Sequence, residues 1–351
     1  MRIAKVCVWS MNLRLAQPYS VAYENIDQAV NVFLRLETDR GHVGLGCANP
    51  DEVVCGETPA SVVAGLEGLA REALEGADPL KSARIRERLS KSLAQAPAVR
   101  AAVDMALFDL LSKIARLPVY QILGGYRDRI MTSVTVGILD SDETVRRALD
   151  LKRQGFRALK LKGGLDVELD IERVLAVRAA VGPTVELRFD ANQGYSVAQS
   201  LRLVEHTRHA RLKLLEQPTP RSELEALGTV TREAPLPIMA DESLMGMRDA
   251  FRIARRGLAD MINVKLMKCG GIWPAMEISS MARAASLEVM IGCMDESALG
   301  IAAALHVALA HPGVRYADLD GHLDLVKDPT AAAVVVRDGM LSPRPLADLD
   351  P

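Results

Sequence analysis

Residues 157–182, RALKLKGGLDVELDIERVLAVRAAVG, have the pattern of one β-strand followed by one amphipathic helix. In the first part, apolar residues alternate with Lys160 and Lys162, which is the period of a strand. After the glycine pair, apolar residues recur at helical spacing. Because successive side chains of a strand point to opposite faces, the two lysines share one face. If that face points inward, the protein has buried two like charges, and we expect chemistry there to explain the cost.

The same strand-and-helix unit recurs along the chain after residue 125. The eight strand candidates are MTSVTVGI (131–138), RALKLKGG (157–164), VELRFDANQG (185–194), LKLLEQP (212–218), LPIMADES (236–243), MINVKLMK (261–268), EVMIGCMDES (288–297) and VRYADLDG (314–321). This order predicts an α/β fold of the (β/α)8 TIM-barrel type. A doubly wound open sheet is the competing architecture. Eight consecutive units, with no Gly-rich first turn, favour the barrel.

A different pattern precedes the barrel. Residues 1–50 alternate like strands, with the hairpin signal DRGH at 39–42. Helical patterns follow at 58–76 and 98–117, and the segment ends near LGGYRDR. We therefore predict an α+β domain over residues 1–124, a barrel over 125–322 and a C-terminal segment over 323–351.

Composition excludes several classes of function. Apolar residues make up 49% of the 351 residues and the formal net charge is −2, so neither disorder nor a nucleic-acid or membrane partner is expected. The start, MRIAKVCVWS, does not resemble a signal peptide. The five cysteines have no metal-binding spacing and fit free thiols of a reducing compartment. We expect a cytoplasmic protein.

Charged residues end five consecutive strand candidates: Lys162, Asp190, Glu216, Asp241 and Lys265. They are 28, 26, 25 and 24 positions apart, so they keep step with the repeat. Any one of them could be a turn residue or a helix cap. Five in phase predict a site, since the carboxyl ends of barrel strands carry the active site.

The residue types indicate the chemistry of that site. Carboxylates from three adjacent strands need a cation among them, and oxygen ligands alone favour Mg²⁺. The lysines come from the strands on either side, where a neighbouring ammonium and a dication lower the pKa of a lysine and allow it to act as a base. Metal and opposed lysines suit the removal of a proton from carbon next to a carboxylate, with an enediolate stabilised by the metal.

These motifs resemble those of the enolase superfamily, muconate-lactonizing subgroup, and most closely those of the dipeptide epimerases. The resemblance covers nearly the whole chain and rests on K-L-K (160–162), D-A-N-Q-G (190–194), E-Q-P (216–218), A-D-E-S (240–243), N-V-K-L-M-K-C-G-G (263–271) and D-L-D-G (318–321). It implies that the N-terminal domain caps the barrel mouth and that C-terminal residues return to the cap.

The resemblance also implies roles for individual residues. Asp190, Glu216 and Asp241 would be the metal ligands. Lys162 and Lys265 would be the acid/base pair. Lys160 would contact the substrate carboxylate and help to hold Lys162, whereas Lys268, past the strand end, would be structural.

The last strand bears on the substrate. Asp318 and Asp320 are two residues apart, so both side chains point the same way and could pair with a free α-ammonium. The resemblance agrees, since D-L-D-G marks dipeptide epimerases. Thr135 either lines the pocket or fills the barrel. An N-acylamino-acid racemase, a cycloisomerase and a non-catalytic binding protein are the alternatives.

Two residues depart from the pattern of Ala-Glu epimerases. Glu24 stands where those enzymes carry an arginine in the cap loop, and Asp295 stands where an apolar residue is common. Both could be solvated surface charges. If they contact the substrate, they would favour a cationic dipeptide over Ala-Glu. The expected partners are a small dipeptide and further copies of the chain in a homo-oligomer, with no nucleic acid and no membrane.

Overall fold

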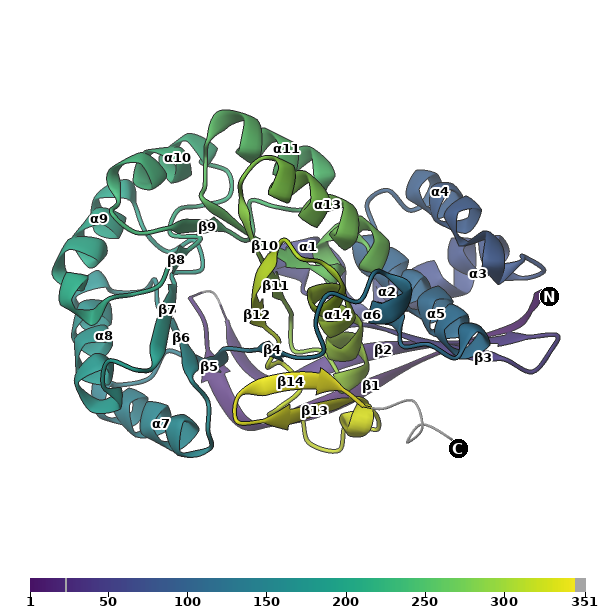
Figure 1. The fold of residues 1–351 in the computed structure, drawn as a ribbon, viewed down its shortest axis with the longest axis horizontal. Coiled ribbons are helices and arrows are strands. Elements are labelled where there is room, and N and C mark those ends of the chain that lie inside the picture. The colour runs from purple at the N-terminus through teal and green to yellow at the C-terminus, as the bar shows by residue number, and fades with distance from the viewer. Residues whose placement is uncertain (23, 345–351) are drawn as a thin grey trace.

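The structure is a computed structural model that describes residues 1–22 and 24–344. Residue 23 and the last seven residues of the predicted C-terminal segment, 345–351, lie outside the described part. The chain forms a ring of strands and helices beside a smaller layer of antiparallel strands and helices (Figure 1). None of the described helices is long and apolar enough to cross a membrane.

Eight parallel strands form the predicted barrel. In chain order they are β5 (Val134–Val136), β6 (Ala158–Lys162), β7 (Glu186–Asp190), β8 (Leu215–Glu216), β9 (Ile238–Ala240), β10 (Met261–Lys265), β11 (Glu288–Gly292) and β12 (Val314–Asp318). Each strand is paired with the next one along the chain. The ring closes where Thr132, just before β5, bridges in parallel to Ala317 of β12. The (β/α)8 prediction is therefore confirmed, and the open doubly wound sheet is excluded.

Helices follow the strands and surround the ring (Figure 1). They are α7 (Ser141–Arg153), α8 (Val167–Val181), α9 (Val197–His206) with η3 (Arg208–Ala210), α10 (Leu224–Glu233), α11 (Met247–Arg256), α12 (Leu266–Cys269), α13 (Ile272–Ala284) and α14 (Ala298–Ala310). Polar caps fix where several begin. Asp166 accepts hydrogen bonds from the first-turn amides of α8, and Ser196 forms a capping box with Gln199 at the start of α9.

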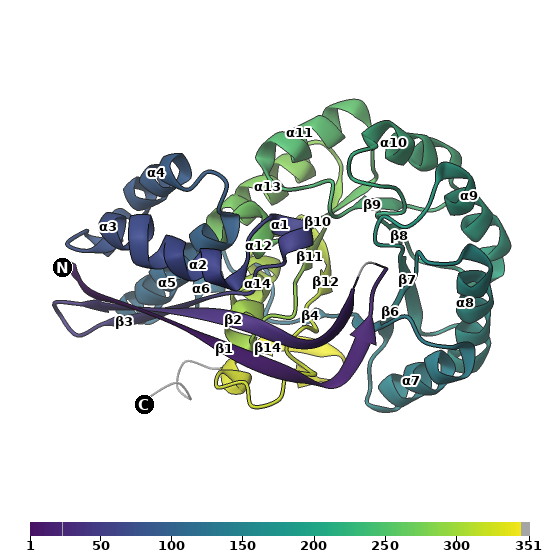
Figure 2. The ribbon, with the colours of Figure 1, turned by 180° about the vertical axis from the view of Figure 1, so that it is seen from behind.

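The N-terminal part is the predicted α+β layer. Its sheet contains β1 (Ile3–Ser20), β2 (Asn25–Thr38) and β3 (Val43–Ala48), all antiparallel and in chain order. Its helical segments are α1 (Glu52–Cys55), α2 (Pro59–Gly65), η1 (Leu66–Ala70), α3 (Arg71–Leu74), η2 (Pro79–Lys81), α4 (Ser82–Ser92), α5 (Pro97–Ala115) and α6 (Val119–Ile122). Figure 2 shows one end of the β1–β2 hairpin reaching over the barrel. There the amide of Ile138 donates to the carbonyl oxygen of Ser20 at 2.9 Å.

The C-terminal residues contact both parts of the molecule. Leu325 bridges to Leu15 of β1, and the amide of Val326 donates to the carbonyl oxygen of Arg14 at 2.8 Å. After η4 (Ala331–Ala333), the hairpin of β13 (Val334–Arg337) and β14 (Met340–Pro343) pairs with β4 (Ile130–Met131) instead.

Helix α5 packs against β3 so closely that only glycine fits at two positions of the strand. A Cβ atom on Gly46 would lie 2.0 Å from the carbonyl oxygen of Ala102, and one on Gly44 would lie 2.3 Å from that of Ala106. Gly46→Ala should therefore lower the free energy of unfolding by about 3 kcal/mol, because backbone must move to admit the methyl group. Urea denaturation measures this. Gly246→Ala is the control, since no heavy atom beyond its own chain neighbours lies within 4 Å of the added Cβ. An equal loss in both variants would contradict the packing explanation.

Candidate active site

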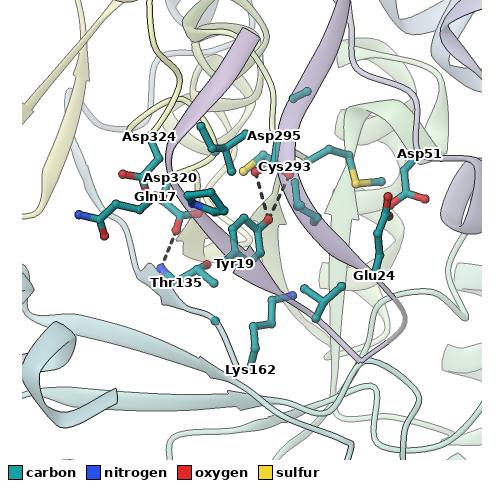
Figure 3. Close-up of a pocket in the computed structure, with 18 of the residues that line it drawn as sticks. Gln17, Tyr19, Glu24, Asp51, Thr135, Lys162, Cys293, Asp295, Asp320 and Asp324 are labelled. Carbon is teal, nitrogen blue, oxygen red and sulfur yellow. Dashed lines mark hydrogen bonds between the residues drawn. The ribbon is translucent and has the colours of Figure 1, made fainter. Parts of the chain in front are cut away.

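A cavity of about 1000 Å³ lies between the carboxyl ends of the barrel strands and the cap. Its lining includes eight of the residues that the sequence singled out: Glu24, Thr135, Lys160, Lys162, Lys265, Asp295, Asp318 and Asp320. Figure 3 shows the cap strands crossing this space, with Tyr19 and Glu24 on the cap side and Lys162 on the barrel side. The structure therefore brings these eight predicted residues to one cavity, whereas Asp190, Glu216 and Asp241 are not among its lining residues.

The three predicted metal ligands form one buried group. Asp190 and Glu216 end β7 and β8, and Asp241 follows β9 directly, so neighbouring strands bring the three carboxylates together. One oxygen of each lies within 4.8 Å of the others, and the residues are 0%, 0% and 1% exposed. Three buried carboxylates this close together need positive charge, which the surrounding lysines partly supply.

Lysines contact this group from both sides. The Nζ of Lys162, on β6, lies 2.8 Å from Asp190, and the Nζ of Lys265, on β10, lies 2.8 Å from Asp241. Lys160 lies 3.2 Å from Asp190 and 3.3 Å from Glu216. The strands β6 and β10 flank the strands of the acidic group, so Lys162 and Lys265 approach the cavity from opposite sides.

These contacts shift the pKa values in both directions. Burial opposes the charged forms of Asp190 and Asp241, but the neighbouring lysines outweigh it and hold both pKa values below the usual range. Burial and the charge of Asp190 raise the pKa of Glu216 to about 8. Lys265 has a pKa well above normal, because Asp241 outweighs the effect of burial. The sequence predicted a lowered pKa for a lysine beside a dication. The side chains around Lys265 alone do not produce it, since they raise its pKa.

Glu242 and Asn192, next to the acidic group, each have a buried oxygen without a hydrogen-bond partner among the described residues: Oε2 of Glu242 and Oδ1 of Asn192. Both residues line the cavity, and the Nδ2 of Asn192 donates to Oε1 of Glu242 at 3.2 Å. Mg²⁺ takes a few carboxylates and keeps several waters, and those waters need acceptors. The donor set of oxygens, together with these two acceptors, fits a hydrated hard divalent cation.

Asp318 and Asp320 both face the cavity but have different partners. Asp318 accepts from Lys160 at 2.5 Å and from Ser133 at 2.6 Å, so both of its oxygens are engaged. Asp320 accepts from the backbone amide of Thr135 at 2.6 Å through one oxygen only. Burial opposes the charge of Asp318, but Lys160 lowers its pKa to about 2, whereas burial and Asp318 raise the pKa of Asp320 to about 6.

Cap residues hold Asp295 in place. Its two carboxylate oxygens both lie 3.1 Å from the hydroxyl of Tyr19, on β1 (Figure 3). Asn31, on β2, donates to the carbonyl oxygen of Asp295 at 3.2 Å and accepts from the amide of Ser297 at 2.8 Å. Burial raises the pKa of Asp295 to about 6. Asp295 is therefore a partly buried carboxylate of the cavity wall that contacts the cap.

Glu24 lies at the other side of the cavity, close to Asp51 (Figure 3). Burial and the charge of Asp51 raise its pKa. Glu24 therefore borders the same cavity as Asp295, but it is exposed and comes from the tip of the cap hairpin.

The sequence did not identify Tyr19, Ser133 or Glu242. Tyr19 contacts a residue 276 positions away, and no local pattern predicts that pairing. Ser133 could have been found, because it precedes Thr135 by two and therefore faces the same way. Glu242 follows Asp241 just after the strand, where the alternation of a strand no longer predicts direction.

A capped (β/α)8 barrel with three carboxylates on consecutive strands, flanked by lysines, defines a protein of the enolase superfamily. Family models agree: the mandelate racemase / muconate lactonizing enzyme N-terminal domain matches residues 3–124, and the enolase C-terminal domain-like model matches residues 143–346. The chain belongs to the mandelate racemase / muconate lactonizing enzyme family.

Relatives that match nearly the whole chain include several epimerases and a racemase. The hydrophobic dipeptide epimerase of Enterococcus faecalis is 37% identical, over 99% of this chain and 97% of its own. The L-Lys-D/L-Arg epimerase of Desulforapulum autotrophicum is 39% identical, over 97% and 96%. A dipeptide epimerase from Methylococcus capsulatus, solved with Mg and the dipeptide L-Arg-D-Lys, superposes with a TM-score of 0.93 at 39% identity, covering 97% of each chain. These relatives are isomerases.

Proposed function

We propose that the protein is a Mg²⁺-dependent dipeptide epimerase that inverts the α-carbon next to the C-terminal carboxylate. One observation carries the proposal: Lys162 and Lys265 line one cavity from strands on opposite sides of a buried carboxylate group. Two bases on opposite sides of a carbon are what inversion requires, since the proton leaves one face and returns to the other.

Asp190, Glu216 and Asp241 would hold the cation. When bound, Mg²⁺ supplies positive charge that stabilises the enediolate formed as the α-proton leaves. One of the two lysines takes the proton from its side of the α-carbon, and the other donates a proton from the opposite side. This is a 1,1-proton transfer, and it needs no other acid or base.

Charged side chains would bind the ends of the dipeptide. Asp320, with one oxygen free of the Thr135 contact, and Asp318 beside it suit the N-terminal ammonium. Lys160 would contact the substrate carboxylate; its position in the cavity lining, next to Asp190 and Glu216, supports this role. Thr135 would help to position Asp320, because its backbone amide donates a hydrogen bond to that carboxylate.

The same carboxylates argue against the alternatives. An N-acylated amino acid or a muconate would bring a neutral or negative group to Asp318 and Asp320, where a cation is favoured. A non-catalytic barrel would have no use for buried lysines on both sides of three carboxylates, which are costly to bury.

The direct test is a dipeptide library incubated with enzyme and Mg²⁺ in D₂O. ¹H NMR should show loss of the α-proton signal of the second residue, and epimer peaks should appear for the accepted dipeptides. Exchange at the first residue only, or none with any dipeptide, would reject the proposed reaction.

Within this reaction, the preferred second residue should be cationic. Glu24 and Asp295 place two carboxylates on the cavity wall, and a charge mismatch in a partly desolvated site costs on the order of a hundredfold in rate or more. Dipeptides ending in Lys or Arg should therefore exceed Ala-Glu in kcat/KM, with hydrophobic dipeptides between. Steady-state kinetics on the three classes measures the ranking.

Asp295→Asn should reduce the difference in kcat/KM between cationic dipeptides and Ala-Glu more than Glu24→Gln does. Hydrogen bonds from Tyr19 to the carboxylate and from Asn31 to the backbone carbonyl hold Asp295, whereas Glu24 lies at a hairpin tip. Glu172→Gln, an exposed position on α8, is the charge-matched control and should leave the ranking unchanged. Ala-Glu as the best substrate of the wild type would reject the cation preference and leave the epimerase chemistry standing.

We also propose a reducing cytoplasm as the location of the enzyme. All five cysteines are free thiols, and Cys47, Cys55 and Cys269 are buried.

A further inference from the structure

A buried polar cluster lies outside the cavity, behind the strand end that carries Lys162. It consists of Asp170 and Arg173 on α8 and Tyr195 on the turn after β7, and all three are buried. None of them is among the described residues that line the cavity. The proposed reaction gives this cluster no role.

The cluster bonds to the backbone at Lys162 and just after it. Nη2 of Arg173 donates to the carbonyl oxygen of Lys162 at 2.9 Å. The amide of Gly164 donates to Oδ2 of Asp170 at 2.8 Å, and the hydroxyl of Tyr195 donates to the same oxygen. Arg173 and Asp170 form an ion pair with each other. One network therefore joins α8 to the turns after β6 and β7.

These turns leave no space for adjustment. A Cβ on Gly164 would lie 2.1 Å from the carbonyl oxygen of Ala191, and one on Gly163 would lie 2.6 Å from Oδ2 of Asp170. A Cβ on Gly194 would lie 2.1 Å from the carbonyl oxygen of Gly164. Because the turns interlock, a shift of the cluster passes directly to the end of β6.

The side of the site that carries Lys265 is held by a different group. Nζ of Lys268 lies 3.1 Å from the carbonyl oxygen of Asn263 and 2.5 Å from that of Asp241. Within the described part of the chain, the hydrogen bonds of Asp170, Arg173 and Tyr195 do not reach β10. The cluster therefore bonds directly to the backbone of Lys162, whereas among the described residues it is connected to the Lys265 side only through the acidic group.

We propose that Asp170, Arg173 and Tyr195 are positioning residues for Lys162 alone, so that they control proton transfer at one face of the α-carbon. The inference rests on the two-lysine function proposed above. A buried ion pair stabilises a protein little more than well-packed apolar side chains would. We therefore attribute the Asp170–Arg173 pair to its effect on geometry, since Arg173 fixes the carbonyl group of Lys162. Misplacement of a base by about 1 Å can cost on the order of a hundredfold in rate.

The test is the double variant Asp170→Asn/Arg173→Met. Changing both partners avoids leaving either charge buried and unpaired, and asparagine can still accept from Gly164 and Tyr195. In D₂O, α-proton exchange from each dipeptide epimer is measured separately by ¹H NMR. The epimer that depends on Lys162 is identified in the same assay as the one that Lys162→Ala no longer exchanges. Exchange of that epimer should fall roughly tenfold to a hundredfold, and exchange of the other should stay within about threefold of the wild type.

Two further variants make the result decisive. Arg178→Met removes another arginine of α8 that donates to backbone carbonyls, those of Ala210, Gly182 and Val185, and it should leave the exchange ratio unchanged. Tyr195→Phe removes only a hydroxyl and should lower exchange on the Lys162 side, so it decides the question if the double variant does not fold. An equal loss for both epimers in the folded variants would overturn the positioning role. If the wild-type enzyme exchanges neither epimer, the proposed function itself fails, which is a separate result.

Discussion

Asp241→Asn should lower kcat roughly a thousandfold or more at saturating dipeptide and Mg²⁺. One of three anionic ligands becomes neutral, and a bound divalent cation contributes several kcal/mol to stabilising the transition state, where about 4 kcal/mol corresponds to a thousandfold. Turnover by NMR and Mg²⁺ affinity by isothermal calorimetry should fall together. The structure adds a cost that the sequence did not reveal: Asp241 is also the ionic partner of Lys265 and Lys268.

Asp241→Asn leaves the buried ammonium groups of Lys265 and Lys268 without this carboxylate. Breaking a buried ion pair lowers the free energy of unfolding by about 3–5 kcal/mol. Thermal unfolding must therefore accompany the kinetics. Glu216→Gln is the companion variant, which also neutralises one of the three ligands but should destabilise the fold less. In the wild type, Glu216 lies 3.3 Å from Lys160 and accepts a hydrogen bond from Asn263 at 2.7 Å, which a glutamine can also accept. Chelation of the wild-type enzyme changes no residue at all. Full turnover by the chelated, metal-free enzyme would rule out the proposed stabilisation by a cation.

The barrel could be predicted because its information is local and repeated. Each unit places an apolar run before a helical pattern. A wrong assignment in one unit would not have changed the predicted fold, because the other seven units have the same pattern. The phase of the charged residues then followed from the geometry of the fold, since parallel strands end on the same face. That is why Asp190, Glu216 and Asp241 could be grouped from spacing alone and lie together in the structure.

The partners of these residues could not be predicted in the same way. The path from Arg188 through Ser133 to Asp318 joins β7, the residue just before β5, and β12, and each hydrogen bond depends on side-chain length and direction within the barrel. Tyr19 and Asp295 lie on opposite sides of the cap–barrel boundary, so their contact depends on how two separate layers dock. Sequence periodicity gives the face on which a residue lies, but it does not give its partner.

The charges of the site show the same limit. The sequence placed Lys160 beside Lys162 on one strand face, which the structure confirms by placing both in the cavity wall. It did not show that Lys160 would be surrounded by three carboxylates, those of Asp318, Asp190 and Glu216. Burial alone would lower the pKa of Lys160, but these carboxylates raise it well above its usual value. Lys160 is therefore suited to remain a cation that binds an anionic group.

Lys162→Ala and Lys265→Ala should each abolish net epimerisation, with a loss of roughly a thousandfold or more, because each removes the acid or base on one face of the α-carbon. The two variants should differ in exchange. In D₂O with Mg²⁺, Lys162→Ala should retain α-proton exchange from one dipeptide epimer only, and Lys265→Ala should retain it from the other. Each epimer is incubated separately and followed by ¹H NMR.

This complementary pattern is expected because the lysines stand on β6 and β10, on either side of the carboxylate group, and each has its own acidic contact, Asp190 for Lys162 and Asp241 for Lys265. Removing one ammonium leaves the other lysine its own carboxylate partner and its own face of the substrate. Lys268→Met is the comparison variant: it removes a buried lysine that also contacts Asp241 and is not among the described residues that line the cavity. Because Lys268 supports the Lys265 side of the site, this variant should lower exchange of the Lys265-dependent epimer without abolishing it. Equal residual exchange of both epimers by Lys162→Ala, or by Lys265→Ala, would mean that one lysine serves both faces, and the division of labour between them would have to be abandoned.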